Sequence, residues 1–386
     1  MRNYFFCSAS LFFVFTLTTP GALAVSVTVT NPTEEAWKEA PVVIPFSSEL
    51  ASLGTLDLVL KNSDTHPIQV DDLNQDGKPD ELVFLATVGA KESKKYVFSE
   101  NTDGVYSPFR SHAGLYHKGI EGVGWESDLI AYRLYWDERN AVDIYGKKKP
   151  VLGLKQYAKP EVNYHQDTPW GMDVLKVGPS LGAGGFGVWV GDKIHKVSKV
   201  ERSCEVIVDG PIRSVMDLKY TNWIVDTRRL ALTARITMTA GQKWAEIELF
   251  LSSLDEKPVP ELVVGVVKHE ETSLIEDKVN GFLGRWGLQA LGPGEKPKGS
   301  HLGFGVLVKP SQVVAFGEDA YNSYIRLKGE QVPAGKFTEN EKAVYASYRI
   351  HASWIQEPGG AKTAEEYRAM LSSVAKLKPE IMISKE

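Results

Sequence analysis

Cysteine is scarce in this chain of 386 residues, which contains only Cys7 and Cys204. Cys7 lies in an N-terminal segment that we expect to be removed, which leaves Cys204 as the only cysteine of the mature protein. A disulfide needs two thiols, and a cysteine metal site needs several. The composition therefore excludes an internal disulfide and a cysteine-ligated metal from the mature chain.

Positive charge and long apolar runs are also lacking. The chain has 44 Lys and Arg residues against 49 Asp and Glu residues, and removal of Arg2 with the N-terminal segment leaves 43 against 49, a net charge of −6. Without a basic excess there is no electrostatic footprint for nucleic acid. No later segment approaches about eighteen consecutive apolar residues, so we expect no membrane span in the mature chain.

The N-terminus has the features of a secretory signal peptide. Arg2 precedes an apolar run from Tyr4 to Thr19, and residues 22–24 (ALA) form a small-x-small cleavage signal. The apolar run is too short to span a membrane. We therefore predict a signal peptide over residues 1–24, cleavage near Ala24 and a periplasmic or secreted mature protein.

Alternating apolar residues predict a protein made mostly of β-strands. The alternation is seen at Leu56, Leu58 and Leu60, at Leu230, Leu232, Ala234, Ile236 and Met238, and at Ile247, Leu249 and Leu251. Near the C-terminus, Thr363 and Glu366 instead form a capping box ahead of apolar residues at helical spacing. These patterns predict a large antiparallel β-sandwich with one C-terminal helix.

A turn-rich segment at residues 100–108 suggests a boundary within the chain. It is too short and too poor in Pro and Gly to be a free linker. We predict an N-terminal β module over residues 25–105 and a main β-domain over residues 106–386.

Residues 72–81 (DLNQDGKPDE) resemble a calcium-binding loop, because oxygen-bearing side chains alternate around a central glycine. The candidate ligands are Asp72, Asn74, Asp76 and Asp80. An EF-hand would need Glu at its twelfth position, where this chain has Val83, so a shorter loop type fits better. The alternative is a charged hairpin turn, and any bound calcium is expected to be structural.

Two glycine-containing strings match nucleotide-binding and hydrolase motifs only as strings. Residues 182–187 (GAGGFG) satisfy the dinucleotide fingerprint, but an extended segment follows where the fingerprint needs a helix. Residues 178–182 (GPSLG) match the nucleophile elbow and lack the same strand-to-helix context. We therefore expect no nucleotide cofactor and no serine esterase.

Aromatic and charged residues are densest in the middle third of the chain. The candidate site residues there are Trp125, Glu126, Asp128, Arg133, Asp143, Tyr164, His165, Asp167 and Trp170. Aromatic rings offer flat apolar faces for sugar rings, while carboxylates, histidine and arginine supply acids, bases and charge. This mixture predicts a groove for a sugar chain.

His165 ranks first among the histidines as an acid or base. It lies in a polar loop between Tyr164 and Asp167, close to Trp170. His269 ranks next, because it follows the apolar run at residues 262–267 and is placed to point into a groove. The alternative for each is a histidine with a structural role only.

The order of several segments resembles the family DUF4861. These segments are DDLNQDGKPDELVFL, GWESDLIAYRLY, AVDIYGKKKP, NYHQDTPWGMDVLKVGPSLGAGG and VDGPIRSVMDLKY, and the resemblance covers nearly the whole mature chain. Ser127 and Tyr145 depart from the family pattern, which has Asn and Trp there. The resemblance implies a secreted bacterial protein of polysaccharide-degradation gene clusters, with a sugar-active role and a fold like the mutarotase-type supersandwich.

Three functions remain open. The first is elimination across C4 and C5 of a uronic acid, as a lyase or an oligosaccharide dehydratase, with Tyr164 and His165 as base and acid. In this reading Arg133 or Arg213 clamps the carboxylate, and the stacking walls are Trp125, Trp170 and Trp286. The second is a glycoside hydrolase with a carboxylate pair, either Glu126 with Asp128 or Asp143 with Asp167. The third is a non-catalytic carbohydrate-binding protein.

Overall fold

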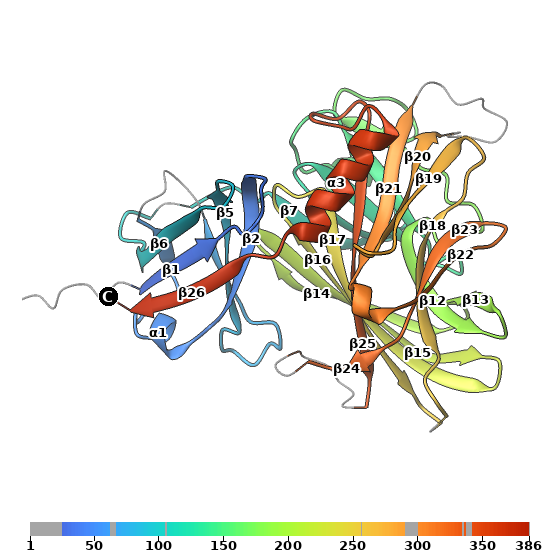
Figure 1. Cartoon of the computed structure of the whole chain (residues 1–386), viewed down its shortest axis with the longest axis horizontal. Helices are drawn as coiled ribbons and strands as arrows, with labels where there is room; N and C mark the ends of the chain where they lie inside the picture. The colour runs from blue at the N-terminus through green and yellow to red at the C-terminus, as the bar shows by residue number, and fades with distance from the viewer. Residues whose placement is uncertain are drawn as a thin grey trace, which may run out of the picture.

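The computed structural model describes residues 25–61, 67–104, 106–255, 257–289, 300–333, 336 and 342–385. The predicted signal peptide lies outside the described residues. Most of the described chain is antiparallel β-structure, so the predicted fold class is confirmed (Figure 1). None of the helices in the described part has the length and apolar character needed to cross a membrane.

Nine strands form the largest sheet of the described chain. In order they are β14 (Glu201–Asp209), β15 (Arg213–Val225), β16 (Arg228–Thr239), β17 (Trp244–Ser253), β25 (Val344–Trp354), β21 (His301–Val308), β20 (Phe282–Leu288) and β19 (Thr272–Asp277), with β24 (Glu330–Gln331) paired to β25. The predicted alternation holds, because Leu232, Ile236 and Leu249 point into one core. The outer face of the sheet carries polar residues such as Glu246 and Glu248.

Two five-stranded sheets form the second layer of the sandwich. One has the order β11 (Gly171–Asp173), β10 (Val142–Lys147), β9 (Ile130–Tyr135), β8 (Gly122–Ser127) and β7 (Ser111–Tyr116). The other has the order β13 (Lys193–Lys196), β12 (Ala183–Val190), β18 (Glu261–Val267), β23 (Asn322–Leu327) and β22 (Val313–Glu318). Their inner residues share the core with the large sheet, which rigidly supports what lies on their outer faces.

Glycines 182–187 lie in and before strand β12, and no helix follows them. A side chain at Gly184 would approach Ile350 to 2.2 Å, so a Cβ there would collide with a neighbouring strand. This segment is therefore a strand in close contact with other strands, in agreement with the expectation from the residues that follow it.

The predicted C-terminal helix is confirmed as α3 (Ala364–Lys376). Thr363 is its N-cap, and the side-chain oxygen accepts a hydrogen bond from the Glu366 N–H at 3.2 Å. The helix packs against β19 to β21 (Figure 1). Its Tyr367 and Leu371 side chains are buried. The other described helices are short: α1 (Ser48–Ala51), α2 (Leu154–Tyr157) and a 3-10 turn at Pro310–Gln312.

Two smaller sheets pack together at the N-terminal end of the described chain (Figure 1). One has the order β26 (Glu380–Lys385), β1 (Val25–Thr30), β6 (Ser93–Glu100) and β3 (Leu58–Leu60); the other has the order β2 (Trp37–Pro45), β5 (Glu81–Val88) and β4 (Ile68–Asp71). The last strand of the chain therefore completes the sheet of the first. The division at residues 105 and 106 stays a prediction, to which the structure adds this C-terminal strand.

Two arginines join the small sheets to the rest of the protein. Arg213 of β15 forms ion pairs with Asp71 at 2.6 Å and with Glu81. Arg110 donates to Glu39 of β2 at 2.7 Å and also pairs with Asp128. Because Asp71, Asp128 and Arg213 are buried, the contacts fix how β2, β4 and β5 meet the larger sheets.

Candidate functional site

Strand alternation gathers charged and aromatic residues on the outer face of the sheet that contains β9 to β11. Arg133 of β9 lies opposite Asp143 of β10, and Tyr145 of β10 lies opposite Asp173 of β11. Residues on the other parity, such as Ile144, enter the main core. The outer face therefore holds two carboxylates beside one arginine.

The loop before β11 folds back over this face and brings Tyr164 and His165 to it. The Tyr164 carbonyl accepts a hydrogen bond from the Asp173 N–H at 2.9 Å. Gly171, with φ 140°, ends the loop, and a Cβ there would lie 1.9 Å from the Gly146 carbonyl oxygen. Only glycine fits this close return, so the local sequence fixes the position of the loop.

His165 and Asp173 form a pair in which one partner is exposed. The distance from His165 Nδ1 to Asp173 Oδ2 is 3.3 Å, and the exposed fractions of the two side chains are 56% and 6%. The hydrogen bond to Asp173 raises the pKa of His165. A carboxylate at Nδ1 orients the imidazole and leaves Nε2 on the open side of the ring, as a general base requires.

Arg133 does not act as the predicted carboxylate clamp, because it is fully buried and already paired. Its guanidinium donates to Asp143, to the Tyr135 hydroxyl at 2.6 Å and to the Ile120 carbonyl at 2.8 Å. It also donates to the Tyr164 hydroxyl at 3.3 Å. The arginine therefore helps to position the Tyr164 hydroxyl. Burial lowers the pKa of Arg133, but the neighbouring carboxylates outweigh this effect and raise it.

Asp143 is buried with Asp173 on either side of the same arginine. Asp173 Oδ2 lies 3.7 Å from the Arg133 guanidinium. Burial, and after it the negative charge of Asp173, raise the pKa of Asp143 to about 7. One cation thus serves two carboxylates, an arrangement that holds a proton near neutral pH.

Aromatic rings enclose the cluster. Tyr145 packs against Tyr157 with ring centroids 4.6 Å apart and against Tyr164 at 5.6 Å, and Trp170 lies 4.4 Å from Tyr157. The buried hydroxyls of Tyr145 and Tyr157 have no hydrogen-bond partner among the described residues. Trp170 is half-buried and packs against the same cluster as Tyr164, and its role in binding a sugar ring stays a prediction.

Glu126 and Asp128 are structural, and the prediction that they share a face is wrong because β8 ends at Ser127. Glu126 is fully buried, pairs with Lys147 at 2.5 Å and accepts the Gly153 and Leu154 N–H groups at the start of α2. Asp128 pairs with Arg110 instead. Neither carboxylate opens into a groove.

Trp125 and Trp286 do not form substrate walls. Trp125 is fully buried in the main core and stacks on Tyr132 with ring centroids 6.0 Å apart. Trp286 packs beneath α3, stacked on Tyr367 and His301. Both rings are already covered by protein, so neither offers a face to a ligand.

The remaining predicted site residues lie apart from His165 or at the margin of the cluster. Arg213 holds the N-terminal sheets, as described above. His269 shows no contact with the cluster among the described residues, and burial lowers its pKa. Asp167 is exposed and pairs with Lys148, whose backbone N–H donates to the Trp170 carbonyl at 3.0 Å.

The predicted calcium loop forms the turn between β4 and β5, where its side chains accept backbone hydrogen bonds. Asp72 accepts from Gly77 at 2.7 Å, Asn74 from Asp76 at 2.9 Å, and Asp80 from Leu73 at 2.7 Å; Asp76 accepts from Lys78 at 2.9 Å. Within the described ranges, no three His, Cys, Asp or Glu side chains are grouped closely enough to hold a metal. Calcium binding by this loop stays a prediction.

Sequence reasoning missed Asp173 and Tyr135 and gave Asp143 a different role. Asp173 lies only eight positions after His165 and follows Trp170 within a short strand, which is the one local signal that it was available. Tyr135 alternates with Arg133 along β9, and this spacing was also visible. The position of the buried Arg133 between these residues depends on how the strands pair, and strand pairing cannot be read from the sequence.

A relative is an uncharacterized protein, P7, of Formosa agariphila, which is 25% identical over 325 residues, covering 74% of this chain and 77% of that protein. The fold is similar to two solved structures from Enterococcus faecalis. They are a protein in glycosyl hydrolase family 38, with TM-score 0.47 and 10% identity, and an alpha-mannosidase, with TM-score 0.48 and 12% identity. The alignments cover 95% of this chain and only 48% and 46% of those structures, so the chain spans about half their length. Residues 29–379 match the family described as Domain of unknown function (DUF4861), and the chain therefore belongs to that family.

Proposed function

We propose that this protein is a secreted or periplasmic enzyme that acts on oligosaccharides containing uronic acid and eliminates a group across C4 and C5. The observation that carries the proposal is the exposed His165, oriented by the buried Asp173 and adjacent to the Tyr164 hydroxyl. A histidine with one nitrogen fixed and the other open is suited to proton removal. A hydroxyl that accepts from arginine keeps its own proton for donation.

The elimination uses both groups. His165 Nε2 takes the proton from C5, the C–H electron pair forms the C4–C5 double bond, and the C4–O bond breaks. Tyr164 gives its proton to the departing oxygen, which leaves as an alcohol from a glycosidic bond or as water from a chain end. The products are an unsaturated uronate and that alcohol or water, and a second proton transfer through solvent restores His165 and Tyr164.

The substrate carboxylate needs a cation other than Arg133. Arg139 is 46% exposed and lies 3.6 Å from the centroid of the Tyr135 ring, whose hydroxyl contacts Arg133. Lys148 is partly exposed beside Trp170. We assign charge recognition to these two cations, because a mobile exposed cation can exchange its own carboxylate partner for that of a substrate.

Hydrolysis by a carboxylate pair has less support from the geometry. That chemistry needs two carboxyl groups facing one open space. Glu126 and Asp143 are fully buried, and Asp128 is held by Arg110 and by the Gly241 N–H at 2.8 Å. In contrast, the His165 side chain is exposed, so a substrate can reach it.

One assay separates the three candidate functions. The purified protein is incubated with oligogalacturonates, oligomannuronates and glucuronate-containing oligosaccharides, and unsaturated-uronate absorbance is followed together with new reducing ends. Elimination gives absorbance, which His165→Gln abolishes and Glu161→Gln, an exposed change four positions before it, leaves largely in place. Reducing ends without absorbance would indicate a hydrolase, and binding without either would indicate a carbohydrate-binding protein.

A further inference from the structure

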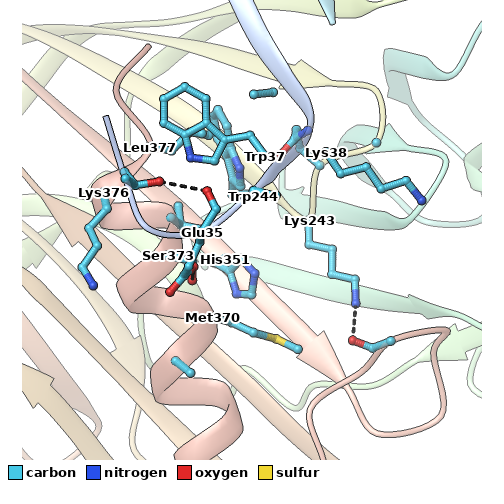
Figure 2. Close-up of a pocket in the computed structure, with 18 of the residues that line it drawn as sticks. Glu35, Trp37, Lys38, Lys243, Trp244, His351, Met370, Ser373, Lys376 and Leu377 are labelled. Atoms are coloured by element: carbon cyan, nitrogen blue, oxygen red, sulfur yellow. Dashed lines mark hydrogen bonds between the residues drawn. The ribbon is translucent and has the colours of Figure 1, made fainter. Parts of the chain in front are cut away.

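The groove between α3 and residues 32–38 has no feature that selects a ligand (Figure 2). Its volume is about 1050 Å³, but its Trp244 and Trp37 side chains are only 5% and 8% exposed. The carboxylates of Glu35 and Glu366 balance the charges of its exposed lysines. Groups that need a partner from outside the chain lie instead in the His165 cluster.

Two buried hydroxyl groups of that cluster are left without a partner. Tyr145 of β10 and Tyr157 of α2 are fully buried, and neither hydroxyl forms a hydrogen bond within the described part of the chain. A buried donor without a partner lowers stability, whereas phenylalanine would fill the same space without this penalty. Unpaired groups of this kind are rare in folded proteins, so two of them in one cluster point to a partner that arrives with a ligand.

Both tyrosines lie beside Asp173, the residue that orients His165. Tyr145 is opposite Asp173 in the pairing of β10 with β11. The Cβ position of Gly171, two residues before Asp173, lies 2.9 Å from the Tyr157 hydroxyl oxygen. The centroids of the Tyr145 and Tyr157 rings are 4.6 Å apart. The two side chains therefore form one patch next to the pair of His165 and Asp173.

The charges around the patch favour a neutral hydroxyl group over an anion. Burial raises the pKa of Tyr145 and of Tyr157, and the negative charge of Asp173 adds to the rise, so both hydroxyls keep their protons and can donate them in hydrogen bonds. Arg133 supplies one positive charge for the two carboxylates of Asp143 and Asp173, which leaves no positive charge for an anion. A sugar hydroxyl can accept from a tyrosine without carrying a charge of its own.

Trp170 covers the patch and can uncover it while the backbone stays in place. Its half-buried ring lies 4.4 Å from the Tyr157 ring. The Trp170 carbonyl accepts a hydrogen bond from the Lys148 N–H at 3.0 Å. Rotation about the side-chain bonds of Trp170 leaves this bond intact, and with it the loop that carries His165. A rotated Trp170 opens a way to the Tyr157 hydroxyl.

We propose that Tyr145 and Tyr157 form a hydroxyl-binding subsite of the His165 site, in which their O–H groups donate to hydroxyl oxygens of a sugar ring once Trp170 turns outward. That these oxygens belong to a sugar rests on the proposed function. Recognition of a uronate is then divided, because Arg139 and Lys148 bind the carboxylate and the two tyrosines bind ring hydroxyls. A sugar without those hydroxyls leaves buried donors unpaired, which is how a binding site rejects such an analogue.

The first test compares the stability of Tyr145→Phe and Tyr157→Phe with that of Tyr348→Phe. The Tyr348 hydroxyl is also buried but donates to the Gly184 carbonyl at 2.8 Å. Without ligand, we expect the first two variants to melt at or above the temperature of wild type, because they lose an unpaired hydroxyl, and Tyr348→Phe to melt lower. If all three variants lose stability equally, the two hydroxyls have partners in the free protein, and the subsite is overturned.

The second test measures affinity by calorimetry in the mature protein, with each tyrosine variant combined with His165→Gln so that substrate is not consumed. The probes are oligogalacturonates, oligomannuronates and glucuronate-containing oligosaccharides. We expect Tyr145→Phe and Tyr157→Phe each to weaken binding about three- to tenfold, the loss of one hydrogen bond, and Tyr348→Phe to leave it unchanged. Unchanged affinity in the first two variants, or no binding of any probe, contradicts the subsite.

Failure of the proposed function gives a different result. A protein that eliminates, but whose affinity for every probe ignores both hydroxyls, keeps the elimination and loses the subsite. A protein that forms no unsaturated product, but whose affinity for a probe depends on both hydroxyls, keeps the subsite and loses the elimination.

Discussion

His165 and Asp173 divide two tasks between an exposed group and a buried one. Asp173 sits in a short strand whose neighbours exclude water, and its oxygen faces the imidazole at 3.3 Å. A buried carboxylate at this distance favours the protonated imidazole and fixes its orientation. Asp173 is thus a positioning residue, and its effect on the reaction should pass through the pKa of His165.

Asp173→Asn should shift the acid limb of the pH profile for kcat/KM toward lower pH. The hydrogen bond to Asp173 raises the pKa of His165, so its removal lets the neutral imidazole form at lower pH. The rate at the optimum should also fall, by roughly tenfold or more, because the ring is less well oriented. The pH profile of each variant on an acidic oligosaccharide provides the measurement. An acid limb that stays in place would remove Asp173 from this role.

Asp143 should make folding stability depend on pH in a defined window. Its pKa in the folded protein is raised to about 7, whereas the unfolded chain has the ordinary value near 3.8. The folded state therefore holds a proton that the unfolded state has lost between these values, and the stability contributed by Asp143 declines as pH rises from about 4 to 7. Because Asn cannot lose a proton and resembles the protonated carboxyl, the melting temperature of wild type should fall relative to that of Asp143→Asn as the pH rises over that range. A constant difference contradicts the shifted pKa, and Asp192→Asn, in an exposed turn, is the control.

At the level of elements, local patterns predicted strands and the last helix well. The alternation at Leu230 to Met238 became β16, and the capping box at Thr363 became the start of α3. The same patterns could not show that Glu126 accepts hydrogen bonds from the start of α2. That contact joins residues 28 positions apart in the sequence, which no periodic pattern connects. Two carboxylates close together in a sequence therefore cannot be assigned to one face of a strand until the ends of that strand are known.

The turn between β4 and β5 makes a testable element. Its four oxygen-bearing side chains now accept backbone hydrogen bonds, and bound calcium would add a second set of contacts to the same oxygens. If the ion binds the folded protein only, excess chelator should lower the melting temperature and added calcium should restore it. The elimination should continue, because the turn lies apart from His165. Identical melting curves with and without chelator would leave a charged turn without metal.

For the whole molecule, contacts distant in sequence decided what the sequence left open. The chain ends meet in one sheet, where β26 pairs with β1 in register from Val25 and Lys385 to Thr30 and Glu380. Arg213 was a candidate clamp because its type suits carboxylates, yet it binds Asp71, 142 positions earlier. The residue type indicated that Arg213 binds a carboxylate, but the carboxylate belongs to the protein itself.

Removal of residues 380–386 should destabilise the protein. The deletion opens the hydrogen-bonding edge of β1, whose Val25, Val27 and Val29 form part of a buried core. We expect a loss of about 1–3 kcal/mol in the free energy of unfolding, measured by denaturant titration. Met382→Thr, at a side chain that is 62% exposed, should leave stability nearly unchanged. A deletion as stable as wild type would show that β26 contributes little to the N-terminal sheets.

The central claim is that His165 removes the C5 proton of a uronic acid. The most direct measurement uses an acidic oligosaccharide labelled with deuterium at C5 and follows the label by mass spectrometry of the products. We predict that each unsaturated product has lost the deuterium, that labelled substrate reacts more slowly, and that His165→Gln abolishes the loss. Products that retain deuterium at C5 would contradict the account, because a bond to C5 that survives cannot have supplied the electrons of the new double bond.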